Sequence, residues 1–271
     1  KILRSLQPYK SFYWPDLRKG WKLRSVLLRN TVYKGIHQGQ RCFIVGNAPS
    51  INQLDMSLLR GEIVFSVSSG YHHPLYDDYM PRYHCVPQLT FSNLITEQVV
   101  IDWFREMHTA IGKSELFLST TEYDFVLRHG LFTGRKVNYV GMYKRMDIGT
   151  LNVDLTDLIY GVQSVPIMVL QIALYMGFSK IYMIGCDHDT VCTGKYTYFY
   201  DQTVLKNKDL SVDEENNTNF SVELENTYYL FQQYRHIQRL AGSIGCSIYN
   251  ASPVGLLDVF ERVSFEELLN L

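Results

Sequence analysis

Short apolar runs recur along this chain, each ending in small or acidic residues, and stretches with helical periodicity separate several of them. Clear examples of the runs are Cys42 to Val45, Glu62 to Ser68 and Lys180 to Cys186. Their β-branched and aromatic content is typical of strands that are buried on both faces of a sheet. Because strand-like and helical segments alternate, the sequence predicts an α/β fold with a mostly parallel sheet, flanked by helices and joined by right-handed crossovers.

The other predicted elements continue this alternation. Further strands are expected at Arg82 to Val86, Glu115 to Ser119 and Ser247 to Asn250, and helices at Thr96 to Ala110, Ser164 to Met176, Glu223 to Ala241 and Ser264 to Leu271. Apolar residues surround the helix that starts at Ser164 almost completely, so we expect it to be buried, with Ser164 as its N-cap. Ligands of such sheets lie beyond the carboxyl ends of the strands.

The first apolar run ends in a turn that offers backbone N–H groups to an anion. The turn consists of Gly46, Asn47, Ala48, Pro49 and Ser50, and a helix is expected to begin there and continue to Leu59. Such a strand-to-helix turn suits a phosphate, which makes it a candidate nucleotide site. An ordinary connection between strand and helix is the alternative. A conventional NAD site is not expected, because the dinucleotide fingerprint needs glycine where this chain has Ala48 and Ile51.

The strongest chemical signal is Asp187-His188-Asp189, which follows the central apolar run. Three ionisable side chains at the mouth of a buried strand are costly unless they are used or solvated. His188 is our candidate general base because histidine titrates near neutrality, and a hydrogen-bonded structural histidine is the alternative. Asp187 could orient the imidazole or bind ribose hydroxyls. Asp189 is a weak candidate metal ligand, and a divalent metal is not favoured because three adjacent side chains cannot all point one way.

Residues 190–220 change character and are predicted to form a lid over the substrate. Tyr196, Tyr198 and Tyr200 alternate, which places their hydroxyls on one face of an extended segment, where they could bind a leaving-group phosphate. Packing within the loop is the alternative. We expect His72-His73 to form a surface turn, and a position at the border of the cleft is the alternative. His236 is expected to be solvated or to cap its helix, and a position lining the acceptor cleft is the alternative.

Composition indicates a globular protein with one main domain. The 271 residues carry a formal net charge of -1, which gives no general attraction to nucleic acid, and the five cysteines favour a reduced, cytoplasmic location. No apolar run approaches the roughly 18 residues that a membrane span needs, and the chain starts without an apolar signal segment. We expect an N-terminal arm over residues 1–38, a main domain over 39–189 and 221–271, and the lid between them.

The N-terminal arm combines Lys and Arg with aromatic residues and shows no clear periodicity. We interpret it as packing on the core. Peripheral contact with the inner face of the cytoplasmic membrane is the alternative, and it is disfavoured because the charges are spread rather than clustered.

Three motifs together resemble one family. They are Phe43 to Ser50, Met176 to Asp189, and Ile248 to Ser252 with Val259 to Val263. The family is that of the motility-accessory-factor or 6-hydroxymethylpterin pyrophosphokinase-like proteins, whose fold is similar to the bacterial sialyltransferases of glycosyltransferase family 42. The resemblance covers about residues 39–269. It implies a Rossmann-like (GT-A-type) domain that binds a nucleotide-sugar, with CMP-activated nonulosonic acids as the leading donors.

The resemblance also implies roles for single residues. Gly46, Asn47, Pro49 and Ser50 match the family's nucleotide-contacting turn, in which Ala48 replaces a glycine. Ser68 and Ser69 stand where the sialyltransferases carry a donor-binding asparagine. Gln163-Ser164 lies near their Thr-Ser-Gly beside the donor, and Tyr198 corresponds to a phosphate-binding tyrosine. Their base histidine precedes the late helix, where residues 219–228 of this chain contain none.

The expected function is therefore sugar transfer from a CMP donor to a bacterial surface glycan or lipid-linked glycan, with no cofactor required. A pterin-type pyrophosphokinase that uses ATP and Mg²⁺ is the main alternative, and a non-catalytic nucleotide-binding relative is another. Phosphoryl transfer from ATP needs several cationic clamps, and Lys195 is the only cation close to the motifs, which favours the first function. Because the related sialyltransferases are oligomers, the resemblance also implies self-association.

Overall fold

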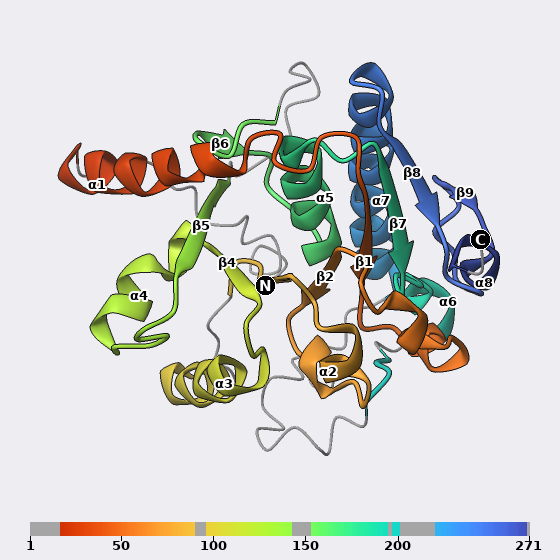
Figure 1. The fold of residues 1–271 in the computed structure, drawn as a ribbon, viewed down its shortest axis with the longest axis horizontal. Helices are drawn as coiled ribbons and strands as arrows, with labels where there is room; N and C mark the ends of the chain where they lie inside the picture. The colour runs from red at the N-terminus through yellow and green to blue at the C-terminus, as the bar shows by residue number, and fades with distance from the viewer. Residues whose placement is uncertain (1–16, 90–95, 143–152, 195–196, 201–219, 270–271) are drawn as a thin grey trace.

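The computed structural model describes residues 17–89, 96–142, 153–194, 197–200 and 220–269. Within them the chain forms one sheet of nine parallel strands in the order β6-β5-β4-β3-β2-β1-β7-β8-β9, with helices on both faces (Figure 1). The strands are β1 Arg41–Val45, β2 Val64–Val67, β3 Tyr83–Cys85, β4 Glu115–Ser119, β5 Val137–Met142, β6 Leu158–Ile159, β7 Lys180–Ile184, β8 Ser247–Asn250 and β9 Glu261–Arg262. The predicted α/β class with a parallel sheet flanked by helices is confirmed.

Helices connect the strands in the alternating manner that the sequence indicates. They are α1 Leu17–Leu28, α2 Tyr76–Tyr79, α3 Glu97–Ala110, α4 Tyr123–Arg128, α5 Val165–Met176, α6 Thr190–Thr193, α7 Phe220–Ser243 and α8 Phe265–Leu269. Five 3₁₀ turns join them: η2 Arg29–Tyr33, η3 Pro49–Gln53, η4 Met56–Leu59, η5 Gly70–His72 and η6 Thr120–Glu122. Among the described residues, no helix is both long and apolar enough to cross a membrane.

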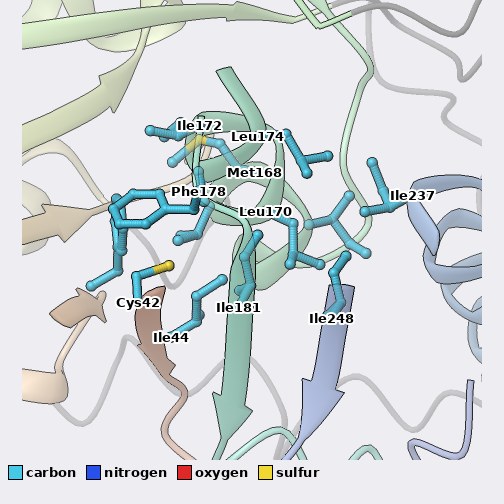
Figure 2. Packing of buried hydrophobic residues seen from close by; sticks show 14 of the residues in the cluster. Cys42, Ile44, Met168, Leu170, Ile172, Leu174, Phe178, Ile181, Ile237 and Ile248 are labelled. Atoms are coloured by element: carbon cyan, nitrogen blue, oxygen red, sulfur yellow. The ribbon is translucent and has the colours of Figure 1, made fainter. Parts of the chain in front are cut away.

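Two apolar clusters fill the space between the sheet and the helices. Helices α5 and α7 cover one face, where Ile44 of β1, Ile181 of β7 and Ile248 of β8 point toward α5 (Figure 2). Helices α2, α3 and α4 contribute to the cluster on the other face, which contains Phe43 and Val64. Alternate residues of each strand therefore face opposite layers, as both-sided burial of a parallel sheet requires.

The order of the strands places a topological switch between β1 and β7. From β1 the chain adds strands on one side as far as β6, and α5 then carries it back to β7 on the other side of β1. The connection after β1 packs on one face of the sheet, and α7, which leads from β7 to β8, packs on the other. In open α/β sheets, the carboxyl edge at such a switch is the usual place for a ligand.

Helix α5 is buried as predicted, because every residue from Pro166 to Met176 is inaccessible. Ser164 occupies the N-cap position as expected, with extended backbone angles, although its side chain makes no capping hydrogen bond in the described part of the chain. Gly177 ends the helix with a left-handed φ of 86°, a conformation that glycine adopts without strain.

Three other sequence expectations need correction. Residues 49–59 form the two turns η3 and η4 instead of one helix, because Asp55 accepts a hydrogen bond from the Ser57 backbone N–H and starts a second turn. The N-terminal arm contains α1, which the sequence did not suggest, and this helix does pack on the body, against β5. In α7, helical spacing predicts Leu224 and Tyr228 on the same side as Tyr234, Ile237 and Leu240, but Leu224 and Tyr228 are exposed whereas the other three are buried.

The predicted lid is described only in part. Residues 190–194 contain α6 and residues 197–200 form a short segment, whereas Tyr196 and residues 201–219 lie outside the described residues, as do 1–16 of the arm.

Candidate functional site

The carboxyl ends of β1 and β7 meet through backbone contacts. The Gly46 N–H donates to the Ile184 carbonyl at 2.8 Å, and the Ala48 N–H donates to the Gly185 carbonyl at 3.0 Å. A Cβ on Gly46 would lie 2.2 Å from the Gly185 oxygen, a distance that real Cβ atoms do not adopt. Glycine is required at position 46 because the two strand ends approach so closely.

Asp187 fastens the candidate nucleotide turn. Its Oδ1 accepts from the Ser50 hydroxyl at 2.5 Å, and its Oδ2 accepts from the Ser50 backbone N–H at 3.2 Å. Both residues are buried, and burial raises the pKa of the Asp187 carboxyl, opposed by the two bonds from Ser50. The structure thus brings together the two motifs that the sequence singled out, and it gives Asp187 a positioning role.

Asn47 presents an unused acceptor at this edge of the sheet. Its Nδ2 donates to the Val67 carbonyl of β2 at 3.3 Å, while its buried Oδ1 has no hydrogen-bond partner among the described residues. An unpaired buried acceptor costs about 1–3 kcal/mol, which a ligand donor would recover. The neighbouring Gly70 leaves the space open, because a Cβ there would lie 3.2 Å from Oδ1.

Ser68 and Ser69 are held by neighbouring side chains. Ser68 has a left-handed φ of 46°, and its carbonyl accepts from Nε2 of His84 at 2.9 Å. The His84 Nδ1 then accepts from the Ser66 hydroxyl at 2.7 Å, and burial lowers the pKa of His84 to about 3, so the ring is neutral. The Ser69 hydroxyl accepts from the indole of Trp103 at 3.2 Å. The two serines lie at the expected edge, and the interactions seen there position the turn.

His188 lies at the site in a left-handed conformation with a φ of 50°. Its Nε2 is 2.7 Å from the hydroxyl of Tyr234, a fully buried residue of α7. Burial lowers the pKa of His188 to about 4, so the expectation that it titrates near neutrality is wrong. No hydrogen bond joins His188 to Asp187 within the described residues, so the structure does not support the imidazole-orienting role of Asp187.

An aromatic segment crosses the nucleotide turn. The Phe199 N–H donates to the Asn47 carbonyl at 2.9 Å, and the Asn52 amide donates to the Phe199 carbonyl at 3.1 Å. The rings of Tyr198 and Tyr200 stack with centroids 5.3 Å apart and an angle of 4°. Tyr198 and Tyr200 therefore lie on one face, as expected, and the third tyrosine of the set, Tyr196, lies outside the described residues.

Two histidines that we expected on the surface pack beneath this aromatic segment. The His72 ring lies 5.6 Å from that of Tyr200, and the His73 ring lies 5.3 Å from that of Phe199. Both histidines are largely buried, and burial lowers the pKa of each. The surface-turn interpretation is wrong because the rings of Phe199 and Tyr200, which come much later in the chain, cover the two histidines.

Gln233 of α7 makes two hydrogen bonds to the loop before α5. The Gln163 N–H donates to Oε1 of Gln233 at 2.8 Å, and Nε2 of Gln233 donates to the Gly161 carbonyl at 2.9 Å. No bond joins Gln163 or Ser164 to the nucleotide turn in the described part of the chain. His236, on the same helix as Gln233, is buried with neither ring nitrogen bonded among the described residues, so our expectation of a solvated or capping group is wrong.

The loop after β8 closes on Asp187 and was not anticipated. The Leu256 N–H donates to the Asp187 carbonyl at 2.7 Å, and a Cβ on Gly255 would lie 2.6 Å from the Asp187 Cα. Arg262 of β9 holds this loop by donating to the carbonyls of Ser252, Val254 and Gly255. Burial raises the pKa of Asp187, and the charge of Arg262 opposes that rise together with the bonds from Ser50. The position of Arg262 inside the third sequence motif was the signal that could have revealed it.

A metal site is not evident in the described part of the chain, where no three His, Cys, Asp or Glu side chains are grouped to hold an ion. Asp189 stands at the N-cap of α6, where its carbonyl accepts from the Cys192 N–H at 2.8 Å.

Neither a protein-family model nor a curated protein matches this sequence. Function is therefore inferred from the residues and their geometry.

Proposed function

We propose that this chain is a cytoplasmic glycosyltransferase that moves a sugar, of the sialic-acid-like nonulosonic type, from a CMP-activated donor to a bacterial surface glycan. The observation that carries the proposal is the double hydrogen bond between Ser50 and Asp187. It joins the first two motifs of the family resemblance at the topological switch, which is where an open α/β sheet binds its ligand.

The turn has the groups that a nucleotide needs. Asn47 offers an unpaired Oδ1 to the N–H or O–H donors of a nucleoside, and the rings of Tyr198 and Tyr200 lie on the segment bonded to the Asn47 carbonyl. Tyrosine hydroxyls can donate to the phosphate of CMP as it departs. In this proposal Ser50 and Asp187 keep the turn in shape and do not react.

Transfer also requires a base for the acceptor hydroxyl. His188 can serve if its Nε2 carries the ring proton and donates it to the Tyr234 hydroxyl, since Nδ1 then keeps its lone pair. Within the described residues Nδ1 makes no hydrogen bond. Burial lowers the pKa of His188 to about 4, so the ring is neutral at physiological pH and can accept a proton, but it is a weaker base than an exposed imidazole.

The pyrophosphokinase alternative gains no support from the cations near the site. Arg262 is the described cation whose charge acts on Asp187, and both of its terminal nitrogens already donate to loop carbonyls. An ATP-dependent reaction would need such cations to bind phosphate instead.

Calorimetry with CMP and with ATP, each with and without Mg²⁺, tests the proposal. We expect CMP to bind in the absence of Mg²⁺ and ATP to bind weakly or not at all. Ser50→Ala should weaken CMP binding, whereas the exposed Ser57→Ala, a matched change on the next turn, should not. Turnover of a CMP-activated nonulosonic acid by the unmodified chain then tests the transfer itself. Binding of ATP that depends on Mg²⁺, with no binding of CMP, would overturn the proposal in favour of the pyrophosphokinase.

A further inference from the structure

The charge of this chain is distributed unevenly along the sequence. Residues 17–54 contain seven Lys and Arg and no Asp or Glu, although the whole chain has a formal net charge of -1. In the described structure, α1, η2 and the turn that follows them carry part of this excess. Local excess of one sign identifies a surface whose partner has the opposite sign.

Exposed apolar side chains lie among these cations. Leu28 is 52% exposed, Val32 61% and Ile36 42%. The exposed cations of the same segment are Lys22, Arg24, Arg29 and Lys34. We call these seven side chains the basic apolar surface.

The segment is fixed firmly to the body, so the surface is presented in one orientation. The Asn30 amide donates to the carbonyls of Tyr139 and Leu155 at 2.7 and 2.9 Å. The Gly35 N–H donates to the Tyr175 carbonyl at 3.0 Å, at the C-terminal end of α5. Helix α1 extends away from the rest of the molecule at one side of the view in Figure 1.

Among the described residues, few carboxylates oppose the cations. Lys22 lies 3.9 Å from Asp124, and both side chains are more than half exposed, so this pair is weak. On the adjacent turn, the Asp154 carboxylate accepts from Thr156 and that of Asp157 accepts from the Leu158 N–H. Because these carboxylates accept hydrogen bonds within their own turn, they are held away from the cations of the basic apolar surface.

We propose that the basic apolar surface docks on an anionic lipid bilayer. Leu28, Val32 and Ile36 enter the region between headgroups and acyl chains, and the four cations contact lipid phosphates. Apolar side chains exposed beside lysine and arginine suit the interface of an anionic bilayer, where the apolar groups enter the acyl boundary and the cations meet the headgroups. Each such cation strengthens binding to an anionic leaflet about fivefold.

The basic apolar surface adjoins the C-terminal end of α5, whereas the carboxyl edge of the sheet lies toward the N-terminal end of α5, because this helix returns the chain to the start of the parallel strand β7. Gly35 contacts the C-terminal end of that helix, while Ser164 begins it, a separation of about 18 Å for twelve residues. Docking therefore leaves the carboxyl edge of the sheet clear of the lipid. The proposal does not depend on the reaction catalysed.

Co-sedimentation of the full chain with vesicles tests the docking. Phosphatidylcholine vesicles, with and without phosphatidylglycerol, are compared at low and high salt. We expect binding only with phosphatidylglycerol, falling as salt rises. Arg24→Glu combined with Lys34→Glu should weaken binding at least about tenfold. Val32→Ser combined with Ile36→Ser should weaken it as well.

Matched controls change the same chemistry elsewhere. Lys113→Glu with Arg239→Glu alters the net charge equally, and Met80→Ser with Leu127→Ser removes apolar side chains that are 72% and 55% exposed. Both control pairs should bind vesicles like the unmodified chain. Equal loss in test and control pairs would overturn the proposal, as would absence of binding to phosphatidylglycerol. So would a dimer in solution that Val32→Ser with Ile36→Ser converts to monomer, since the surface would then bind a second copy.

Discussion

The Cα hydrogens of Gly46 face the carbonyl oxygen of Gly185, with room for a hydrogen but not for a methyl group. A Cβ on Gly46 would approach that oxygen to 2.2 Å, and a Cβ on Gly185 would lie 2.5 Å from the Ile51 side chain. Two glycines, each directly after a different strand, therefore permit the contact between the ends of β1 and β7 at the switch. This contact therefore fixes where the residues that follow the two strands lie, including Asn47 after β1 and Asp187 after β7.

Gly46→Ala should consequently destabilise the protein and abolish CMP binding. Because the clash is with backbone, relief requires the ends of β1 and β7 to separate, and we expect a loss of about 1–3 kcal/mol in the free energy of unfolding. Denaturant unfolding and calorimetry measure the two effects.

Gly242→Ala is the matched control for that change. Gly242 lies in α7 with nothing within 4 Å of an added Cβ, so alanine should stabilise the helix by about 0.5–1 kcal/mol. Unchanged stability and CMP affinity in Gly46→Ala would show that the contact is looser than described.

Asn47→Ala should weaken CMP binding by about 1–3 kcal/mol while leaving stability nearly unchanged or slightly improved. The free protein carries the cost of an unpaired Oδ1, and alanine removes that cost, which offsets the loss of the 3.3 Å hydrogen bond from Nδ2 to the Val67 carbonyl. Alanine also removes the acceptor that the ligand would satisfy. Asn52→Ala, on the next turn, removes an amide that bonds Phe199 and serves as the comparison. Unchanged calorimetric affinity of Asn47→Ala would place the nucleotide elsewhere.

His188→Asn should lower turnover about 100-fold or more and preserve donor affinity, the usual result of removing a general base. Because burial lowers the pKa of His188 to about 4, the acidic limb of the rate profile should lie near that pH and should disappear in the variant. Steady-state kinetics across pH provides the measurement, with His108→Asn as control. An acidic limb that persists in His188→Asn would assign the base to another residue.

His188 should also make stability depend on pH. Its pKa falls from 6.5 in the unfolded chain to about 4 in the folded one, so between these values the unfolded state binds the extra proton. The contribution of His188 is therefore complete above pH 6.5 and is lost as the pH falls toward 4. Unfolding free energies measured across this range should fall more steeply for the unmodified chain than for His188→Asn, and parallel curves would contradict the assignment.

Local pattern was enough to predict the elements whose burial is uniform. The strand Glu115–Ser119 was identified because its apolar run is short, and the helix Val165–Met176 because its apolar run is long and ends at a glycine. The helix expected from Pro49 was wrong because Asp55 and Ser57 start a turn of their own, a local bond that apolar spacing does not reveal.

The sequence was enough to predict which residues belong to the candidate site, but not which of them contact one another. Ser50 and Asp187 were both singled out, yet their hydrogen bonds depend on β1 lying beside β7, which the order of strands decides. His72 and His73 were misplaced for the same reason, since the aromatic rings that cover them come from residues 199 and 200.

The position of β7 has a consequence for synthesis of the chain. When the ribosome has produced β1 to β6, β1 is the edge of the growing sheet, and its apolar Cys42 to Val45 and free backbone groups await a partner. That partner is made only when residues 180–184 emerge, so the pair of strands at the topological switch is among the last to form. Pairing across so long an interval of sequence is slow, and an uncovered apolar edge invites association with other chains. The nascent protein is most in need of a chaperone in the interval before β7 reaches β1.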